Sequence, residues 1–242
     1  MKNIIIYDFD STLTPYPMPK LKILEKNGMK DGSYNPLFLE LSRKKARDKN
    51  MNLYQAMFET CFEIILSNGD KLIDENFSLG HDKVEYNNGV LEFFEMLNKN
   101  NTKNYLVSSG IKVFLQKTSV APYFEEIYAT TFKYNKMHEA IGIDFLMSDE
   151  NKVYAIKQIL QKNNIFTEDC SKVIYIGDGL SDYYAMKYVK EHGGICILVF
   201  LSSNAKEIAS MKEKNIVSLF TKADFSIDSE LTQYVNKLCR IK

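Results

Sequence analysis

Two carboxylates stand one residue apart near the start of the chain, directly after a run of isoleucines. Asp8 and Asp10 closely follow residues 4–6, which are all isoleucine. Such a β-branched run is typical of a buried parallel strand, and the carboxyl ends of these strands face ligands in open α/β sheets. Two like charges this close cost free energy unless a cation or a catalytic task compensates. The pair therefore indicates a cation site or a catalytic site.

Further polar and charged groups follow two later apolar runs, and a lysine opens a helical pattern between them. These residues are Ser108, Ser109, Gly110, Lys152, Asp178 and Asp182. Since the carboxyl ends of parallel strands share one edge of a sheet, we expect them to converge with Asp8 and Asp10. The glycines that flank Asp178 are not followed by a third glycine at the dinucleotide spacing, so a nucleotide site is not indicated.

Short apolar runs alternate with helical patterns over most of the chain. Strands are expected at residues 3–8, 104–108, 126–130, 172–177 and 195–201 and around 224–227. Helices are expected at residues 90–99, 113–119, 151–162, 182–192 and 205–214, and a hairpin between residues 130 and 148 with its turn at 134–136. This alternation predicts an α/β fold, a doubly wound, mostly parallel Rossmann-like sheet with helices on both faces.

Residues 16–86 interrupt this alternation with helical patterns only. Residues 51–66 carry apolar side chains at the i, i+3, i+4 and i+7 spacing of an amphipathic helix, and shorter helical patterns fit residues 20–26 and 35–49. We therefore expect a small inserted α-helical cap domain at residues 16–86. The remaining residues, 1–15 and 87–242, are expected to form the α/β core domain.

Composition narrows the classes of protein. Lys plus Arg and Asp plus Glu number 31 each, so the balanced charge gives no support to a nucleic-acid partner or a polybasic membrane anchor. The four cysteines are widely spaced, which argues against a structural zinc site and a disulfide framework. No apolar run approaches the roughly 20 residues that span a bilayer. A cytoplasmic protein without a membrane partner is the expectation.

The order and spacing of the chemical groups resemble the four motifs of the haloacid dehalogenase superfamily of phosphohydrolases. Residues 8–12, Asp-Phe-Asp-Ser-Thr, resemble the first motif, and Ser108 in Val-Ser-Ser-Gly resembles the second. Lys152 resembles the third motif and residues 177–182 the fourth. The helical insert is similar to the mobile cap of the phosphoserine-phosphatase-like branch. The resemblance thus covers nearly the whole chain.

This resemblance implies a Mg²⁺-dependent phosphatase that hydrolyses a small phosphorylated metabolite through an aspartyl-phosphate on Asp8. Carboxylates of Asp8 and Asp178 suit Mg²⁺, and the backbone carbonyl of Asp10 is the usual third protein ligand in similar enzymes. The Asp10 side chain is expected to protonate the leaving oxygen and then to deprotonate the attacking water.

The same resemblance assigns the remaining groups to phosphate binding and positioning. The Ser108 hydroxyl, nearby backbone N–H groups at Ser109 and Gly110, and the Lys152 ammonium are expected to bind the phosphoryl group. Asp182 is expected to orient Lys152 or a metal-bound water rather than to bind the ion.

Each role has a plainer alternative. Asp8 and Asp10 could cap a turn, Ser108 could be a helix N-cap with Ser109 in the hydroxyl role, and Lys157 competes with Lys152. Asp182 could be a first-turn helix acid that the macrodipole stabilises. The combination of Asp8 with Asp178 and Lys152 favours the catalytic interpretation.

Other functions share parts of this pattern. A phosphorylation-dependent switch protein of the receiver type lacks an acid two residues after the phosphorylated aspartate and has no room for a cap. Carbon–halogen hydrolysis needs neither a leaving-group acid nor a metal, so Asp10 and Asp178 favour phosphorus chemistry. A phosphotransferase or phosphomutase keeps the same core residues and stays open, because the acceptor is chosen by the cap.

The substrate depends on the cap. Phosphoserine phosphatases hold the charges of serine with a glutamate after the first motif and an arginine on a cap helix, and here Pro17 and Phe58 stand near those places. That lowers the case for phosphoserine, and the Tyr, Phe and Met content of the cap could select an apolar or choline-like leaving group. Tyr16 and Met18 are the expected substrate contacts.

Overall fold

The computed structural model describes residues 3–16, 22–100, 102–201 and 205–241. Within them seven strands form one sheet in the order β4-β3-β2-β1-β5-β6-β7. The strands are β1 (Ile4–Tyr7), β2 (Lys103–Ile111), β3 (Glu126–Tyr134), β4 (Ala140–Phe145), β5 (Val173–Gly177), β6 (Ile195–Phe200) and β7 (Leu219–Lys222). Neighbouring strands are parallel except β3 and β4, which form the predicted antiparallel hairpin. The predicted α/β fold is confirmed.

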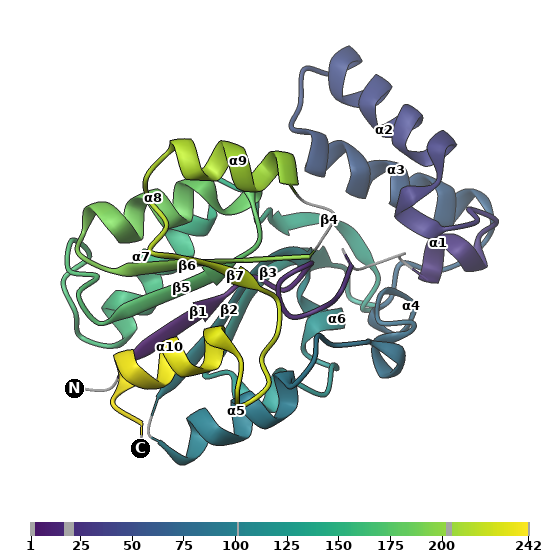
Figure 1. The fold of residues 1–242 in the computed structure, drawn as a ribbon. Helices are drawn as coiled ribbons and strands as arrows, with labels where there is room; N and C mark the ends of the chain where they lie inside the picture. The colour runs from purple at the N-terminus through teal and green to yellow at the C-terminus, as the bar shows by residue number, and fades with distance from the viewer. Residues whose placement is uncertain (1–2, 17–21, 101, 202–204, 242) are drawn as a thin grey trace.

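Helices cover both faces of this sheet, as Figure 1 shows. One face packs against α7 (Lys152–Lys162), α8 (Tyr183–Glu191) and α9 (Ala205–Glu213). The other face packs against α5 (Val90–Lys99), the short α6 (Lys112–Leu115) and α10 (Glu230–Cys239). The sheet is therefore doubly wound.

Strand β1 lies at the centre of the sheet, which explains its apolar run. Ile5 and Tyr7 belong to the apolar cluster on the α5 side, whereas Ile4 and Ile6 belong to the cluster on the α7 side. All four side chains are buried because helices cover both faces. β1 pairs in parallel with β2 and with β5, so the carboxyl ends of these three strands lie side by side.

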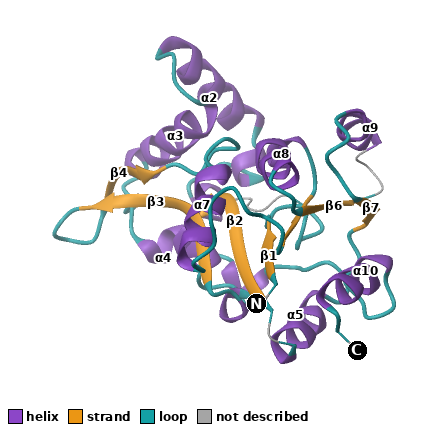
Figure 2. Ribbon diagram, turned by 90° about the vertical axis from the view of Figure 1, so that its left-hand side faces the viewer, coloured by secondary structure: helices purple, strands orange, loops and turns teal. Residues whose placement is uncertain are grey.

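The helical insert lies beyond the end of the sheet, near β3 and β4 (Figures 1 and 2). It contains α1 (Lys22–Lys26), α2 (Pro36–Asp48), α3 (Leu53–Ser67) and α4 (Asp74–Phe77). Asn35 and Asn52 directly precede α2 and α3 as their N-cap residues. Their side chains accept hydrogen bonds from backbone N–H groups of the first turn. These two caps explain why helices start directly after the turn residues.

The insert shares apolar packing with the sheet. The ring of Phe132 on β3 lies 5.6 Å from that of Phe58, 5.1 Å from that of Phe62 and 4.8 Å from that of Phe77, measured between ring centroids. One apolar cluster therefore runs from the insert into the core. The division into two domains at residues 16 and 87 stays a prediction.

Near the carboxyl end of the chain the structure differs from the predicted elements. The strand expected around 224–227 is a turn, and the last strand is β7; Phe225 is buried from that turn among the side chains of α5 and α10. Helix α10 was not expected, although Ser229 caps it by accepting a hydrogen bond from Thr232 N. The apolar residues at 224–227 therefore indicate a buried side chain in a turn and not a strand.

Two element boundaries also differ. Strand β2 continues through Ser108 and Gly110 to Ile111, beyond the expected end at 108, with a register shift against β3. The helix expected at 113–119 is only α6, which closes where Thr118 donates its hydroxyl proton to the Leu115 carbonyl. None of the helices in the described ranges is both long and apolar enough to cross a bilayer.

Candidate active site

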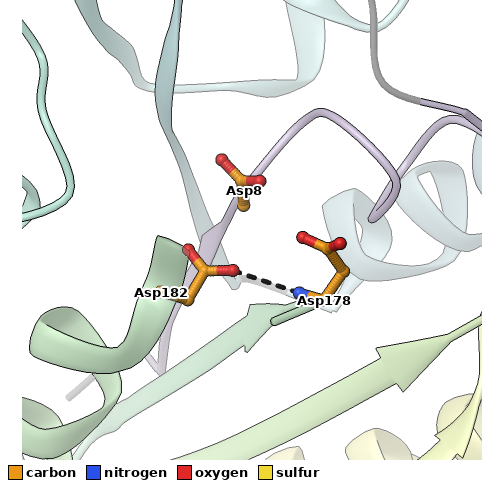
Figure 3. A group of neighbouring side chains, drawn as sticks. All are labelled: Asp8, Asp178 and Asp182. Atoms are coloured by element: carbon orange, nitrogen blue, oxygen red, sulfur yellow. Dashed lines mark hydrogen bonds between the residues drawn. The ribbon is translucent and has the colours of Figure 1, made fainter. Parts of the chain in front are cut away.

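Three aspartates gather where β1 and β5 end (Figure 3). Asp8 follows β1, Asp178 follows β5, and Asp182 ends the short 3₁₀ helix η4 (Leu180–Asp182). One carboxylate oxygen from each lies within 4.8 Å of those from the other two. Asp8 and Asp182 are buried, and Asp178 is half-buried. The predicted convergence at the sheet edge is thus present.

Lys152, the first residue of α7, lies between two of these carboxylates. Its Nζ donates to Asp8 Oδ1 at 3.0 Å and to Asp182 Oδ1 at 2.8 Å, and its side chain is 1% exposed. Burial alone lowers the pKa of Lys152, but Asp182 and Asp8 outweigh it and raise that pKa above its ordinary value. The ammonium therefore keeps its charge inside the protein.

For Asp8 the effect of burial on the pKa is stronger than the opposing effect of Lys152. Burial raises the pKa of Asp8 to about 7, with Lys152 opposing the rise and Asp182 adding to it. A carboxylate in such a position gains from a nearby cation, because the cation favours the charged form.

Asp182 holds the buried lysine in place. Its Oδ1 accepts from Tyr175 Oη at 2.6 Å as well as from Lys152, and its Oδ2 accepts from the Asp178 backbone N–H at 3.1 Å. A Cβ on Gly177 would lie 2.2 Å from Asp182 Oδ2, so only glycine leaves room for this carboxylate. Both oxygens of Asp182 are engaged within the protein.

The donor chemistry at the strand ends fits a hard divalent cation. Asp8 and Asp178 bring carboxylate oxygens together at the open edge of the sheet. Mg²⁺ takes one or two carboxylates together with waters and phosphate oxygens. These two residues could therefore hold the ion.

The loop after β1 is fixed by hydrogen bonds that position Asp10. The Asn87 side chain donates to the backbone carbonyls of Thr12 at 2.8 Å and Thr14 at 3.1 Å. The Ser11 N–H donates to Thr14 Oγ1 at 3.2 Å, and Ser11 has a left-handed φ of 57°. The loop thus turns sharply directly after Asp10, which lines the cavity described next.

A cavity of about 310 Å³ lies between the strand ends and the insert. Its floor comes from the core and its opposite wall from the insert. The floor residues are Asp8, Asp10, Ser11, Ser109, Gly110, Ile111, Lys152, Asp178 and Ser181. The wall residues are Ser33, Tyr34, Phe38, Leu39, Tyr54, Met57 and Phe58.

Some predicted residues do not reach this cavity. Ser108 is fully buried, does not line the cavity, and its Oγ accepts a hydrogen bond from the Gly110 N–H at 3.1 Å. Its neighbour Ser109 lines the cavity instead. Tyr16 is 39% exposed and is not among the residues that line the cavity, and its contact with substrate stays a prediction. Met18 lies outside the described residues.

Most of the wall was not identified from the sequence. Tyr54, Met57 and Phe58 share one edge of α3, where the helical spacing marked an apolar face but not what that face meets. Tyr34 lies on the 3₁₀ helix η1 (Gly32–Tyr34), and no periodic pattern in the sequence predicts this helix. Tyr54 also donates its hydroxyl proton to Asp149 Oδ1 at 3.1 Å, which connects the insert to the loop before α7.

Known proteins share this sequence pattern and this fold. The sequence model of the haloacid dehalogenase-like hydrolases matches residues 5–187. A search of curated proteins by sequence finds no match.

Three solved structures illustrate the shared fold. One is a phosphoserine phosphohydrolase-like protein from Francisella tularensis, 20% identical, with a TM-score of 0.63 over 97% of this chain and 100% of that one. Another is a substrate-bound phosphoserine phosphatase, 17% identical, with a TM-score of 0.63 over 97% of this chain and 98% of that one. A HAD family hydrolase from Salmonella enterica serovar Typhi is 18% identical, with a TM-score of 0.64 over 94% and 71% of the two chains.

Proposed function

The chain belongs to the haloacid dehalogenase-like hydrolase family, and we propose that it is a Mg²⁺-dependent phosphatase of a small phosphate monoester. The observation that carries this proposal is the buried Lys152, which donates to both Asp8 and Asp182 at the edge where Asp178 stands. A charged lysine beside a carboxylate on the floor of a cavity suits a phosphate dianion, whose oxygens must be neutralised before an anionic nucleophile can attack.

Asp8 is the proposed nucleophile. Its carboxylate oxygen attacks phosphorus, the bond from phosphorus to the leaving oxygen breaks, and an aspartyl-phosphate forms on Asp8. Asp8, Asp178 and the Asp10 backbone carbonyl would hold Mg²⁺, whose positive charge would help to neutralise the phosphoryl group. Water then attacks the phosphorus, which releases inorganic phosphate and restores the Asp8 carboxylate.

Asp10 is the proposed general acid and base. It lines the cavity two residues after the nucleophile. In the first step it gives its proton to the leaving oxygen, and in the second it takes a proton from the attacking water, so the cycle is closed.

The remaining groups bind and orient the phosphoryl group. Lys152 adds positive charge beside Asp8, and Asp182 keeps Lys152 in place through a 2.8 Å hydrogen bond. Ser109 and Gly110 line the cavity, and the Ser109 backbone N–H is the proposed donor to a phosphoryl oxygen, because the Gly110 N–H already donates to Ser108 Oγ. The buried Ser108 hydroxyl supports this end of β2 through that hydrogen bond.

Release of phosphate from phosphorylated metabolites tests the proposal. With Mg²⁺ present we expect wild-type protein to release inorganic phosphate from at least one ester, and chelation to stop release reversibly. Asp8→Asn should keep the circular dichroism spectrum and lose essentially all turnover. Full activity of Asp8→Asn would contradict the nucleophile role. Transfer of the phosphoryl group to a second metabolite without release of phosphate would instead identify a phosphotransferase or phosphomutase.

A further inference from the structure

The wall of the cavity that faces the catalytic floor carries no charged side chain among the described lining residues. It is formed by Ser33, Tyr34, Phe38, Leu39, Tyr54, Met57 and Phe58, of which Phe38 is fully buried. The charged residues that line the cavity are Asp8, Asp10, Lys152 and Asp178, and all four belong to the floor. A leaving group that points from the floor toward the insert therefore meets mainly apolar and aromatic surface.

A charged leaving group would lack an ionic partner among the wall residues that the structure describes. The cation on the floor, Lys152, already bonds to Asp8 and Asp182. The carboxylate of a phosphorylated amino acid would have to be desolvated without a second cation, and its ammonium would find no carboxylate on the wall. Burying an ion without a partner costs several kcal/mol or more, because the ion loses its hydration and gains no opposite charge in return.

The wall is already fixed by contacts within the protein. The Phe58 ring packs against the Phe132 ring of β3 in an edge-to-face contact of 5.6 Å. Phe38 is fully buried on the first turn of α2. The Tyr54 hydroxyl donates to Asp149, so its one proton is already engaged. An apolar wall held in this way binds an apolar group without reorganising, which favours affinity.

The two phenols of the wall are uncharged near neutral pH. Partial burial raises the pKa of Tyr34 to about 12, with the charge of Asp10 adding to the rise, and burial likewise raises that of Tyr54 to about 12. Both phenols are therefore protonated near neutral pH. The cavity volume of about 310 Å³ lies at the lower end for small-ligand sites, which favours a small ester.

We propose that the substrate is the phosphate ester of a small, uncharged and largely apolar alcohol, such as one aromatic ring or a short alkyl chain. The proposal rests on the phosphatase activity proposed above and adds the substrate class. The wall carried by α2 and α3 selects this leaving group, and Phe58 holds the wall in place by packing against Phe132 of β3.

Alkyl esters with similar leaving oxygens give the first test. We expect kcat/KM for benzyl phosphate and n-butyl phosphate to exceed that for O-phosphoserine and glycerol 3-phosphate by at least about 100-fold, because a buried unpaired group costs that much discrimination. A preference for O-phosphoserine or glycerol 3-phosphate would overturn the proposal while leaving the phosphatase activity intact. A preference for phosphocholine would also overturn it, since that leaving group is a cation.

A matched pair of variants tests the wall itself. Phe58 and Phe62 lie on the same helix and contact the same Phe132 ring, but only Phe58 lines the cavity. Phe58→Leu should lower kcat/KM for benzyl phosphate about 10-fold relative to methyl phosphate, since part of the ring contact is lost. Phe62→Leu should leave this ratio unchanged. Equal ratios in both variants would show that the wall does not select the leaving group.

A binding experiment separates this proposal from the proposed function. Benzylphosphonate resembles the benzyl ester but cannot be hydrolysed. In calorimetric titrations with Mg²⁺ we expect it to bind at least about 10-fold more tightly than 2-amino-3-phosphonopropionate, for the same desolvation reason. That result stands even if no ester is hydrolysed. Tighter binding of the amino acid phosphonate, or equal binding, would refute the apolar leaving group without any reference to turnover.

Discussion

A buried lysine connects two carboxylates that follow different strands of the sheet into one network. Lys152 comes from α7, Asp8 from the end of β1 and Asp182 from the loop after β5, so the network forms only when the sheet has assembled. The network also includes the Tyr175 hydroxyl and the Asp178 backbone N–H, and its hydrogen bonds are 2.6–3.1 Å long. Substitutions in and around this network are therefore expected to affect different properties, namely the chemical steps in one case and the position of a carboxylate in another.

Asp10→Asn should separate the two chemical steps. With benzyl phosphate the rate should fall by about 10²–10⁴, because the alkoxide leaves without a proton donor. With 2,4-dinitrophenyl phosphate the leaving group needs no proton, so we expect a burst of about one phenolate per protein and then slow turnover. Stopped-flow absorbance measures both.

Wild-type protein is the control for this burst, because it should turn over both esters steadily. An equal loss of rate for both esters, with no burst, would contradict the acid and base role of Asp10 and point to a purely structural one.

Gly177→Ala should move Asp182. The new Cβ would lie 2.2 Å from Asp182 Oδ2 and 2.5 Å from its Cγ, so the carboxylate must shift and its bond to Lys152 must weaken. We expect kcat to fall at least about 100-fold, with a loss of about 1–3 kcal/mol in the free energy of unfolding. Steady-state kinetics and urea unfolding measure the two effects.

Gly142→Ala is the matched control, because a Cβ at Gly142 on β4 meets no atom within 4 Å. Its kcat should stay at the wild-type value. Wild-type kcat in Gly177→Ala would show that the site does not depend on the position of Asp182.

At the level of elements, the ends of the short helices in the insert meet at one aspartate. Asp70, between α3 and α4, accepts from Lys26 Nζ at 2.7 Å, from Asn27 Nδ2 at 3.2 Å and from Asn76 Nδ2 at 3.0 Å. The hydrogen bond from Lys26 is the largest cause that lowers the pKa of Asp70, to about 2. Short helices such as α1 and α4 depend on contacts of this kind, because their own nuclei are unstable.

Asp70→Asn should destabilise the protein in a pH-dependent way. Because the pKa of Asp70 is lower in the folded state, its contribution is present above about pH 4 and disappears as the pH falls toward 2. At pH 7 we expect a loss of about 1 kcal/mol in the free energy of unfolding, since the ion pair is partly exposed. Urea unfolding at pH 7, 5, 4 and 3 should show the gap between variant and wild type closing.

A double-mutant cycle with Lys26→Gln supplies the control for Asp70. The two substitutions should be non-additive at pH 7, and their coupling should be smaller at pH 3. Additivity at pH 7 would mean that the ion pair contributes nothing to stability.

Elements that repeat a strong local pattern could be predicted, and those fixed by distant contacts could not. The isoleucines of β1 and the apolar face of α5 placed both elements within a residue or two. The turn at Phe225 was mistaken for a strand because one buried ring in a turn looks like part of an apolar run.

The same difference holds for the site. Asp8, Asp10, Lys152 and Asp178 were found because parallel strands bring their ends together. Tyr34, Phe38 and Leu39 were not found, because their place on the cavity depends on how the insert packs on β3 and not on their spacing. Ser108 was expected at the cavity, but β2 continues past it and leaves Ser109 there.

At the level of the whole molecule, the two faces of the sheet have different partners. The apolar cluster on the α7 side consists of core residues, whereas the cluster on the α5 side continues through Phe132 into the helices of the insert. The wall of the cavity and the sheet that carries its floor are thus parts of one packed body. We therefore expect the insert and the core to unfold cooperatively.

Phe132→Leu tests that cooperativity. Phe132 is 5% exposed and its ring contacts Phe58, Phe62 and Phe77, so the substitution should lower the free energy of unfolding by about 1–3 kcal/mol. Hydrogen exchange should then speed up by a similar factor in α3 and in β1, because both open in the same transition. Phe145→Leu, which removes a single ring contact with Tyr154, should have a smaller effect. Faster exchange in α3 alone would mean that the insert unfolds as an independent domain, and the cavity wall could then open without the floor.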